Sequence, residues 1–286
     1  MRLYLKIFIL NLIYFTQAKN ILSNGYHQAI GIKRAQDLMN LERTAARIVG
    51  GTQTSAISQY PYQAGIVITL RSRAQSICGG SLVSNTRVLT AAHCWWDGQN
   101  QATQFVIVLG SLLLFSGGTR ITTTDVRVHP NWNANDIKND IAIAIITRVE
   151  YNNNIQAISL PTSSDINKNY AGLSAVATGY GRNTDGGSSS PSTSRLYHVN
   201  LNILTNAQCQ KSFDIPLDGS HLCTDGAKRV GTCDGDSGGP LTVLQNNKRT
   251  LVGIVSFGLA DKCQAGYPSV YTRVTSYLTW IQANLK

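Results

Sequence analysis

Short runs of apolar and β-branched residues alternate with turn residues over most of this chain. The clearest runs cover residues 65–70, 87–91, 104–109, 141–146, 173–178, 195–203 and 251–256. Strands of this length with frequent turns between them are typical of antiparallel sandwiches and barrels. The pattern therefore predicts an all-β fold.

Two segments near the ends of the chain depart from the β pattern. Residues 36–47 favour a helix, and Leu278, Ile281 and Leu285 fall at helical spacing close to the C-terminus. Thr275-Ser276 stands just before that spacing, where a helix cap belongs. We therefore expect one C-terminal helix that begins after this pair and packs against the β structure.

The first eighteen residues have the pattern of a secretory signal peptide. An apolar run at 3–15 follows Met1-Arg2, and small residues lead up to Ala18. The run is too short and too interrupted for a membrane anchor, and the sequence has no other long apolar stretch. We therefore expect residues 1–18 to be removed from a secreted, extracellular protein without a membrane span, leaving a short segment at 19–47 before the β pattern.

Composition narrows the class of protein. Only 14% of the 286 residues are charged and 25 are glycine, which suits a β-rich globular protein. Seven Lys/Arg and two Asp/Glu precede Ile48, so the rest carries 25 − 7 = 18 basic and 15 − 2 = 13 acidic residues. That part is only mildly basic, and it has no basic run with interleaved aromatic residues, so nucleic-acid binding is not expected.

Residues 182–194 are rich in Gly, Ser, Asn and Thr, which predicts an exposed, mobile loop.

Cysteine usage agrees with secretion. The six cysteines are Cys78, Cys94, Cys209, Cys223, Cys233 and Cys263. An even number of cysteines in a secreted chain implies disulfides, and the sequence alone leaves fifteen possible pairings. No two cysteines have the CxxC spacing, so a zinc site is not expected.

A glycine-rich hexapeptide holds the strongest candidate for a reactive serine. Its sequence is Gly235-Asp236-Ser237-Gly238-Gly239-Pro240. Glycines permit a tight turn that presents a hydroxyl at a surface, with backbone N–H groups facing whatever the hydroxyl attacks. A serine in a glycine-rich turn is usually inert, so a reactive one needs a base and an acid from elsewhere in the chain.

His93 and Asp140 are the candidates for that base and acid. His93 ends an apolar run and precedes Cys94, which would hold its imidazole rigidly. Asp140 opens an apolar run, so we expect it to be buried with a partner, whereas Asp136 lies among polar residues and is expected to be solvated. The other histidines lie in the N-terminal segment or in polar, loop-like surroundings: His27, His129, His198 and His221.

The order of these motifs resembles the chymotrypsin/trypsin family of secreted serine peptidases. The resemblance covers residues 48–286. The matching segments are Arg47-Ile48-Val49-Gly50-Gly51, Thr90-Ala91-Ala92-His93-Cys94, Asn139-Asp140-Ile141-Ala142 and the hexapeptide at 235–240. It implies two six-stranded antiparallel β-barrels with a C-terminal α-helix, a crossover near 159–165 and a site in the cleft between the barrels.

The resemblance also implies a role for each candidate residue. Ser237 would be the nucleophile, His93 the general base, and Asp140 the group that orients His93 and stabilises its charged form. The backbone N–H groups of Gly235 and Ser237 would form the oxyanion hole. Family pairing implies the disulfides Cys78–Cys94, Cys209–Cys223 and Cys233–Cys263. Neither a metal nor a cofactor is implied.

Members of this family are made as zymogens, and the activating cut would here fall between Arg47 and Ile48. The freed Ile48 amine would pair with the buried Asp236 carboxylate, which makes residues 19–47 an activation propeptide. This segment contains no cysteine, so no disulfide would tether it after the cut.

The substrate pocket implied by the resemblance carries no charge. Gly231 would be its floor, and Gly258 and Ser269 its walls. The residues around Gly231 and Phe257 are similar to those of arthropod chymotrypsin-like enzymes and the related brachyurin collagenases. We therefore expect a preference for large apolar or aromatic residues, and a separate trypsin-like protease to cut after Arg47.

Two alternatives stay open at this stage. One is an elastase-like or broad specificity, and the other is a non-catalytic, protease-like binding protein. On the leading interpretation, the chain is a monomeric digestive enzyme. Its partners are protein or peptide substrates, the activating protease and protein inhibitors.

Overall fold

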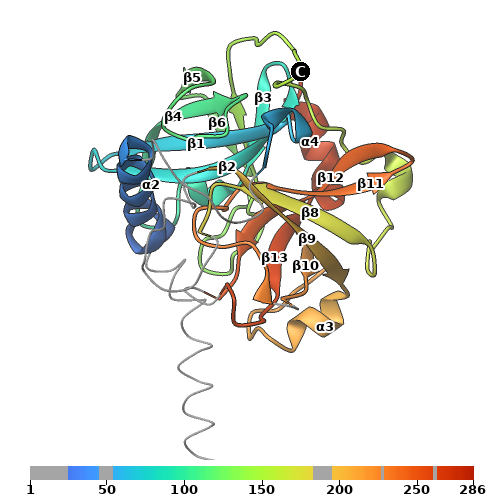
Figure 1. Cartoon of the computed structure of the whole chain (residues 1–286). Coiled ribbons are helices and arrows are strands. Elements are labelled where there is room, and N and C mark those ends of the chain that lie inside the picture. Colours follow the sequence, from blue (N-terminus) through green and yellow to red (C-terminus); the bar gives the residue numbers. More distant parts are fainter. Residues whose placement is uncertain (1–24, 45–53, 183–194, 227–228, 260–262) are drawn as a thin grey trace, which may run out of the picture.

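The computed structural model (Figure 1) describes residues 25–44, 54–182, 195–226, 229–259 and 263–286. Antiparallel strands dominate these ranges and form two units, coloured cyan to green and yellow to red in Figure 1. No helix in them is long and apolar enough to cross a membrane. The expected signal peptide, the Arg47–Ile48 bond and nearly all of the glycine-serine loop lie outside the described residues.

The first unit is a seven-stranded sheet in the order β5-β4-β1-β2-β3-β7-β6. Its strands are β1 (Gln63–Leu70), β2 (Gln75–Ser84), β3 (Arg87–Thr90), β4 (Ala102–Leu109), β5 (Thr119–Thr123), β6 (Val126–Val128) and β7 (Ala142–Ile145). The two edge strands, β5 and β6, are separated in the chain only by Thr124 and Asp125. The chain therefore changes pairing partner at this point, from β4 to β7, and one barrel strand is split in two.

The second unit is a closed barrel in the order β10-β13-β12-β11-β8-β9. Its strands are β8 (Ser174–Gly179), β9 (Tyr197–Leu204), β10 (His221–Thr224), β11 (Pro240–Gln245), β12 (Lys248–Phe257) and β13 (Ser269–Arg273). The turn between β11 and β12 is made by Asn246 and Asn247, both at positive φ, as a two-residue hairpin turn requires. The prediction of an all-β fold with two antiparallel barrels is confirmed, with the first barrel's sheet left open between β5 and β6.

Strand β1 is buried on both faces. Ile66 and Ile68 point into the main core, while Val67 belongs to a second cluster on the opposite face. That cluster includes Ala35 and Leu38 of α2 (Ile32–Thr44). The segment before the barrels therefore covers an apolar outer face of the first one (Figure 1).

The helix at the C-terminus is present, but its predicted cap is wrong. A 3-10 turn at Val274–Tyr277 precedes α4 (Leu278–Asn284), and Tyr277 occupies the cap position without a side-chain hydrogen bond. Thr275 is buried, and the Ser276 hydroxyl instead donates to the Gly219 carbonyl at 3.1 Å.

Two histidines expected in loops lie in strands. His198 is in β9, and the buried His221 is in β10. His198 lies between Tyr197 and Val199, and His221 begins its strand after Ser220, so the prediction of loops was wrong for both.

The chain passes from the first barrel to the second near Ser159. The Ile158 N–H donates to the Leu82 carbonyl of β2, and the next carbonyl, that of Ser159, accepts from Leu251 of β12. Adjacent residues therefore bond to different barrels, which pins the crossover where the two units meet.

Candidate active site

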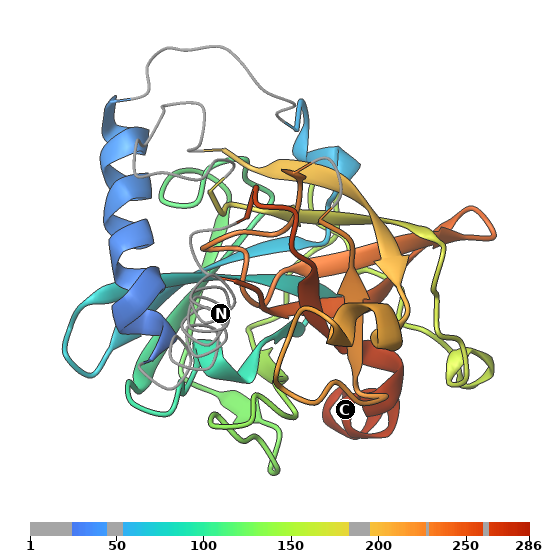
Figure 2. The ribbon, with the colours of Figure 1, turned by 90° about the horizontal axis from the view of Figure 1, so that it is seen from below.

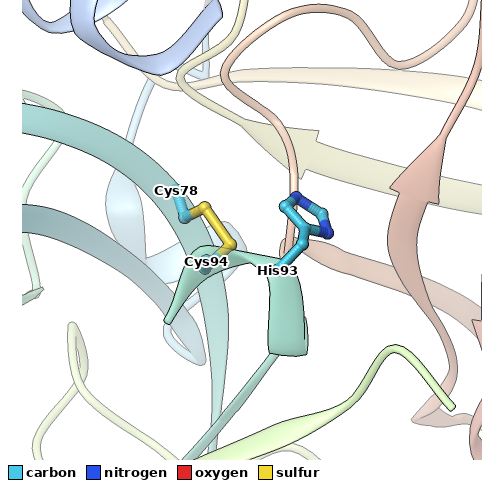
Figure 3. Close-up of side chains that lie close together, drawn as sticks. All are labelled: Cys78, His93 and Cys94. Atoms are coloured by element: carbon cyan, nitrogen blue, oxygen red, sulfur yellow. A yellow bond between two sulfur atoms is a disulfide. The ribbon is translucent and has the colours of Figure 1, made fainter. Parts of the chain in front are cut away.

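His93 lies on a short turn that a disulfide anchors. Strand β3 ends at Thr90, and a 3-10 turn follows at Ala92–Cys94. Cys94 is bonded to Cys78 of β2, and the imidazole projects from the turn away from the sulfur atoms (Figure 3). His93 is fully buried, so its orientation depends on the hydrogen bonds around it.

Asp140 is 1% exposed and supplies those hydrogen bonds. Its Oδ2 accepts from His93 Nδ1 at 2.7 Å, and its Oδ1 accepts from the His93 backbone N–H at 2.9 Å. The Ser256 hydroxyl also donates to Oδ2, at 2.6 Å. Because all three partners face the carboxylate as donors, they fit its ionised form and fix the proton of His93 on Nδ1.

The other ring nitrogen of His93, Nε2, carries a free lone pair that can accept a proton. Within the described residues, Nε2 has no hydrogen-bond partner. His93 is therefore oriented through Nδ1 by the Asp140 carboxylate, while Nε2 is available to act as a base.

Ser237 lies on a tight turn packed against the first barrel, and it is 8% exposed. Its carbonyl accepts from the Gly79 N–H of β2 at 2.7 Å. Gly238 has φ +80°, and a Cβ there would lie 2.2 Å from Thr90 Oγ1. Glycine is thus needed for both the conformation and the close approach.

One side chain links Ser237 to His93. The Tyr26 ring lies edge-on to the His93 ring, with centroids 4.8 Å apart. Burial raises the pKa of the Tyr26 hydroxyl, and the neighbouring Ser237 side chain acts to lower it. The structure therefore brings together the predicted base and nucleophile around Tyr26, a residue that the sequence did not single out.

Asp236 is partly buried, and two backbone N–H groups hold its carboxylate. Its carboxylate accepts from the Gly181 N–H at 2.8 Å and from the Cys233 N–H at 2.9 Å. Burial raises its pKa to about 6, while these two N–H groups and the charge of Arg34 act to lower it. A Cβ on Gly179 would lie 2.0 Å from the carboxylate, so the space around it tolerates no larger residue there.

The backbone around Ser237 also offers donors. Gly235 has φ +97°. Within the described part of the chain, the N–H groups of Gly235 and Ser237 donate to no other group. They are the pair that the resemblance assigns to an oxyanion.

The predicted pocket residues are only partly brought together. A Cβ on Gly231 would lie 3.2 Å from Ser269 Oγ, so floor and wall are adjacent, whereas one on Gly258 would meet nothing within 4 Å. A cavity of about 280 Å³ extends from Gly231 to Asp236, and neither Gly258 nor Ser269 lines it. Its lining includes two cations, Arg182 and Arg229, beside the single carboxylate.

The three disulfides join Cys78–Cys94, Cys209–Cys223 and Cys233–Cys263. Two of them lie in clusters of potential metal ligands, since Cys78 and Cys94 lie close to His93, and Cys233 and Cys263 close to Asp234. Sulfur atoms bonded to each other offer no thiolate, so these clusters are not metal sites as they stand.

The sequence predicted a helix at 36–47, and α2 spans Ile32–Thr44, but the packing of the segment at 25–44 on the first barrel was missed. The segment runs from the candidate catalytic residues along the outside of the first barrel, as Figure 2 shows for α2. A usable signal was present, because Ala35, Leu38 and Leu41 have helical spacing and are all buried. The second-barrel donors to Asp140 had no such signal, since a serine in a strand is unremarkable.

Comparisons with known proteins agree with this geometry. Residues 48–281 match the protein family described as Trypsin. The chain is 35% identical to "Collagenase" of Hypoderma lineatum, over 85% of this chain and 89% of that protein. It is 39% identical to "Brachyurin" of Leptuca pugilator, over 82% and 97%. A solved structure titled "HL collagenase" superposes with a TM-score of 0.74 at 34% identity, over 83% of this chain and 98% of that one.

Proposed function

Because the chain belongs to the trypsin family and is a serine endopeptidase with protein substrates, we propose that Ser237, His93 and Asp140 are its catalytic triad. One observation carries this proposal. The Asp140 carboxylate holds Nδ1 of His93 at 2.7 Å while Nε2 is unused, which is the state a general base needs.

In the proposed mechanism the Ser237 hydroxyl attacks the carbonyl carbon of the scissile peptide bond. His93 Nε2 takes the hydroxyl proton, and Asp140 stabilises the resulting imidazolium. The N–H groups of Gly235 and Ser237 donate to the oxygen that becomes negative. His93 then gives its proton to the leaving amine as the C–N bond breaks. Water attacks the acyl-enzyme while His93 takes its proton, and His93 returns that proton to Ser237 as the acid product leaves.

For specificity, we propose a preference for large apolar or aromatic side chains before the cut bond. The predicted pocket residues Gly231, Gly258 and Ser269 bring no charge. A Lys or Arg side chain would lose hydration without a carboxylate among these three residues to pair with, whereas an apolar one would gain about 1.5–3 kcal/mol from burial.

We further propose that the protein is secreted as a zymogen, with a signal peptide at 1–18 and a propeptide at 19–47. A trypsin-like protease would cut after Arg47, since an uncharged pocket does not favour Arg. The cavity beside Asp236 supports this proposal, because Ala177, Val199 and Val230 give it the apolar lining that a new Ile48 terminus needs. Digestion, action as a monomer and control by protein inhibitors complete the proposal.

The decisive experiment combines labelling with kinetics. The chain is cut after Arg47, the fragments are separated, and a serine-directed phosphonylating agent is added. Incorporation at Ser237 and faster cleavage after Phe or Leu than after Ala or Arg are expected. Fastest cleavage after Ala would indicate an elastase-like enzyme, and no incorporation would indicate a binding protein without turnover.

A further inference from the structure

We propose that the catalytic cleft is also a specific binding site for a peptide, residues 25–44 of this chain. The peptide remains bound as a non-covalent competitive inhibitor after the Arg47–Ile48 bond is cut. This inference rests on the proposed function for the position of that cut. It adds a ligand, and the ligand's binding surface, to the proposed site.

The first anchor of the peptide occupies the catalytic residues. Tyr26 is 2% exposed, its ring packs edge-on against His93 with ring centroids 4.8 Å apart, and the Ser237 side chain is close enough to lower the pKa of its hydroxyl. The Tyr26 hydroxyl also donates to the Ile77 carbonyl of β2 at 2.9 Å. A substrate carbonyl must approach Ser237 through the same space, so peptide and substrate exclude one another.

The residues beside Tyr26 fit the surface closely. The His27 backbone N–H donates to Asp97 Oδ2 at 2.9 Å, and its Nδ1 lies 2.8 Å from Ser76 Oγ. A Cβ on Gly31 would lie 1.9 Å from Ser76 Oγ. The His27 N–H and Nδ1 are paired, Nε2 has no partner within the described residues, and the glycine permits close contact. Close contact with several paired polar groups is typical of a formed interface.

The second anchor lies against the nucleophile's own loop. Arg34 is 3% exposed, and it donates through a terminal nitrogen to the Tyr180 carbonyl at 2.9 Å. Its Cγ would lie 3.0 Å from a Cβ on Gly235. Its positive charge also lowers the pKa of Asp236, the carboxylate that we assign to the Ile48 amine. Arg34 thus supplies positive charge to the same carboxylate before the cut.

The third anchor is the apolar face of α2. Ala35 and Leu38 pack into the cluster that contains Val67, Ile77 and Leu114. At the far end of the helix, the Glu42 carboxylate accepts from the backbone N–H groups of Leu114 and Phe115 and from the Ser116 hydroxyl. Contacts along the whole segment therefore hold it independently of the peptide bond at Arg47.

The first test follows activity after the cut. The full chain is cleaved at Arg47 without separating the fragments, and hydrolysis of a Phe peptide is measured over a wide range of dilution. Specific activity should rise on dilution as the peptide dissociates. Synthetic peptide 25–44 added to the separated enzyme should raise KM and leave kcat unchanged.

The second test uses variant peptides. Tyr26→Ala should weaken inhibition at least about 30-fold, and Arg34→Gln at least about 10-fold, since buried Tyr and Arg anchors dominate binding energies. Lys33→Gln is the matched control: it removes the same charge from the adjacent, exposed position. It should change inhibition less than about threefold.

Binding is also measured without catalysis, by fluorescence anisotropy of labelled peptide on cleaved, separated Ser237→Ala chain. Saturable binding that Tyr26→Ala abolishes supports the inference even if the enzyme has no turnover. Undetectable binding together with dilution-independent activity overturns it and leaves the peptidase assignment standing. Equal weakening by Lys33→Gln and Arg34→Gln overturns the anchor at Arg34.

Discussion

Replacing Asp140 by Asn tests the core of the proposed mechanism. The carboxylate receives three donors: His93 Nδ1, the His93 backbone N–H and the Ser256 hydroxyl. An amide has only one acceptor oxygen. If that oxygen faces the backbone N–H, the new NH₂ group faces Nδ1 and forces the His93 proton onto Nε2. His93 then cannot accept the Ser237 proton.

The loss of activity in Asp140→Asn can be estimated from these contacts. In the opposite amide orientation, the NH₂ group meets the buried backbone N–H, and the unmade hydrogen bond costs about 1–3 kcal/mol. The amide therefore settles with the wrong tautomer of His93. Loss of the base should lower kcat roughly 10⁴-fold, or about 5.4 kcal/mol of barrier, with little change in KM.

The assay is steady-state hydrolysis of a Phe peptide by the cut and separated enzyme, with urea unfolding as a check on the fold. Ser256→Ala is the matched control, because it removes one donor and leaves both His93 contacts in place. It should lower kcat no more than about tenfold. The reasoning is refuted if a folded Asp140→Asn enzyme keeps kcat within tenfold of wild type, or loses no more than Ser256→Ala.

Three further changes probe other parts of the molecule. Gly181→Ala should cost about 1–3 kcal/mol of unfolding free energy and most of the activity, because its Cβ would lie 2.5 Å from the Asp236 carboxylate. Inhibition by peptide 25–44 should weaken up to about tenfold per pH unit below 6.5, because burial lowers the pKa of His27 to about 4 in the bound state. Replacing Cys209 and Cys223 by Ala should lower stability by about 3 kcal/mol, since the bridge spans 14 positions, without lowering kcat.

Each of these has its own control. Gly219→Ala, where a Cβ meets nothing within 4 Å, should be neutral in the same urea experiment. His27 faces Asp97, which raises its pKa, and His93, which lowers it, so His27→Asn peptide should lose most of the pH slope. A slope that survives this change refutes the assignment to His27. A double-cysteine variant that unfolds like wild type contradicts the loop-entropy estimate.

The strands with a clear local signal were predictable. The predicted runs at 173–178 and 251–256 mark β8 (174–179) and the middle of β12 (248–257), whereas β2, β5, β6, β10, β11 and β13 were not among the predicted runs. The split of one strand into β5 and β6 was not predictable, since it depends on which neighbour each half pairs with. The assignment of His93, Asp140 and Ser237 stays a prediction, and it came from motifs that keep their spacing in the sequence.

Other parts of the site have no such local signal. Ser256 and Thr272 are ordinary strand residues until folding brings them to Asp140. Tyr26 and Arg34 lie in a segment that the sequence marked only as removable. Their burial depends on a surface made by distant strands, and the pattern of one segment does not reveal such a surface.

The two barrels hold each other's candidate catalytic residues. Asp140 of the first accepts the Ser256 hydroxyl at its side chain and the Thr272 hydroxyl at its carbonyl, both from the second. Gly79 of the first holds the carbonyl of Ser237 in the second. Neither barrel alone carries all of the candidate catalytic residues. Hydrolysis therefore depends on the correct packing of the two barrels against each other. On the proposed roles, a nascent chain with one barrel formed would lack a complete triad and could not cleave its surroundings, because His93 and Asp140 lie in the first half and Ser237 in the second.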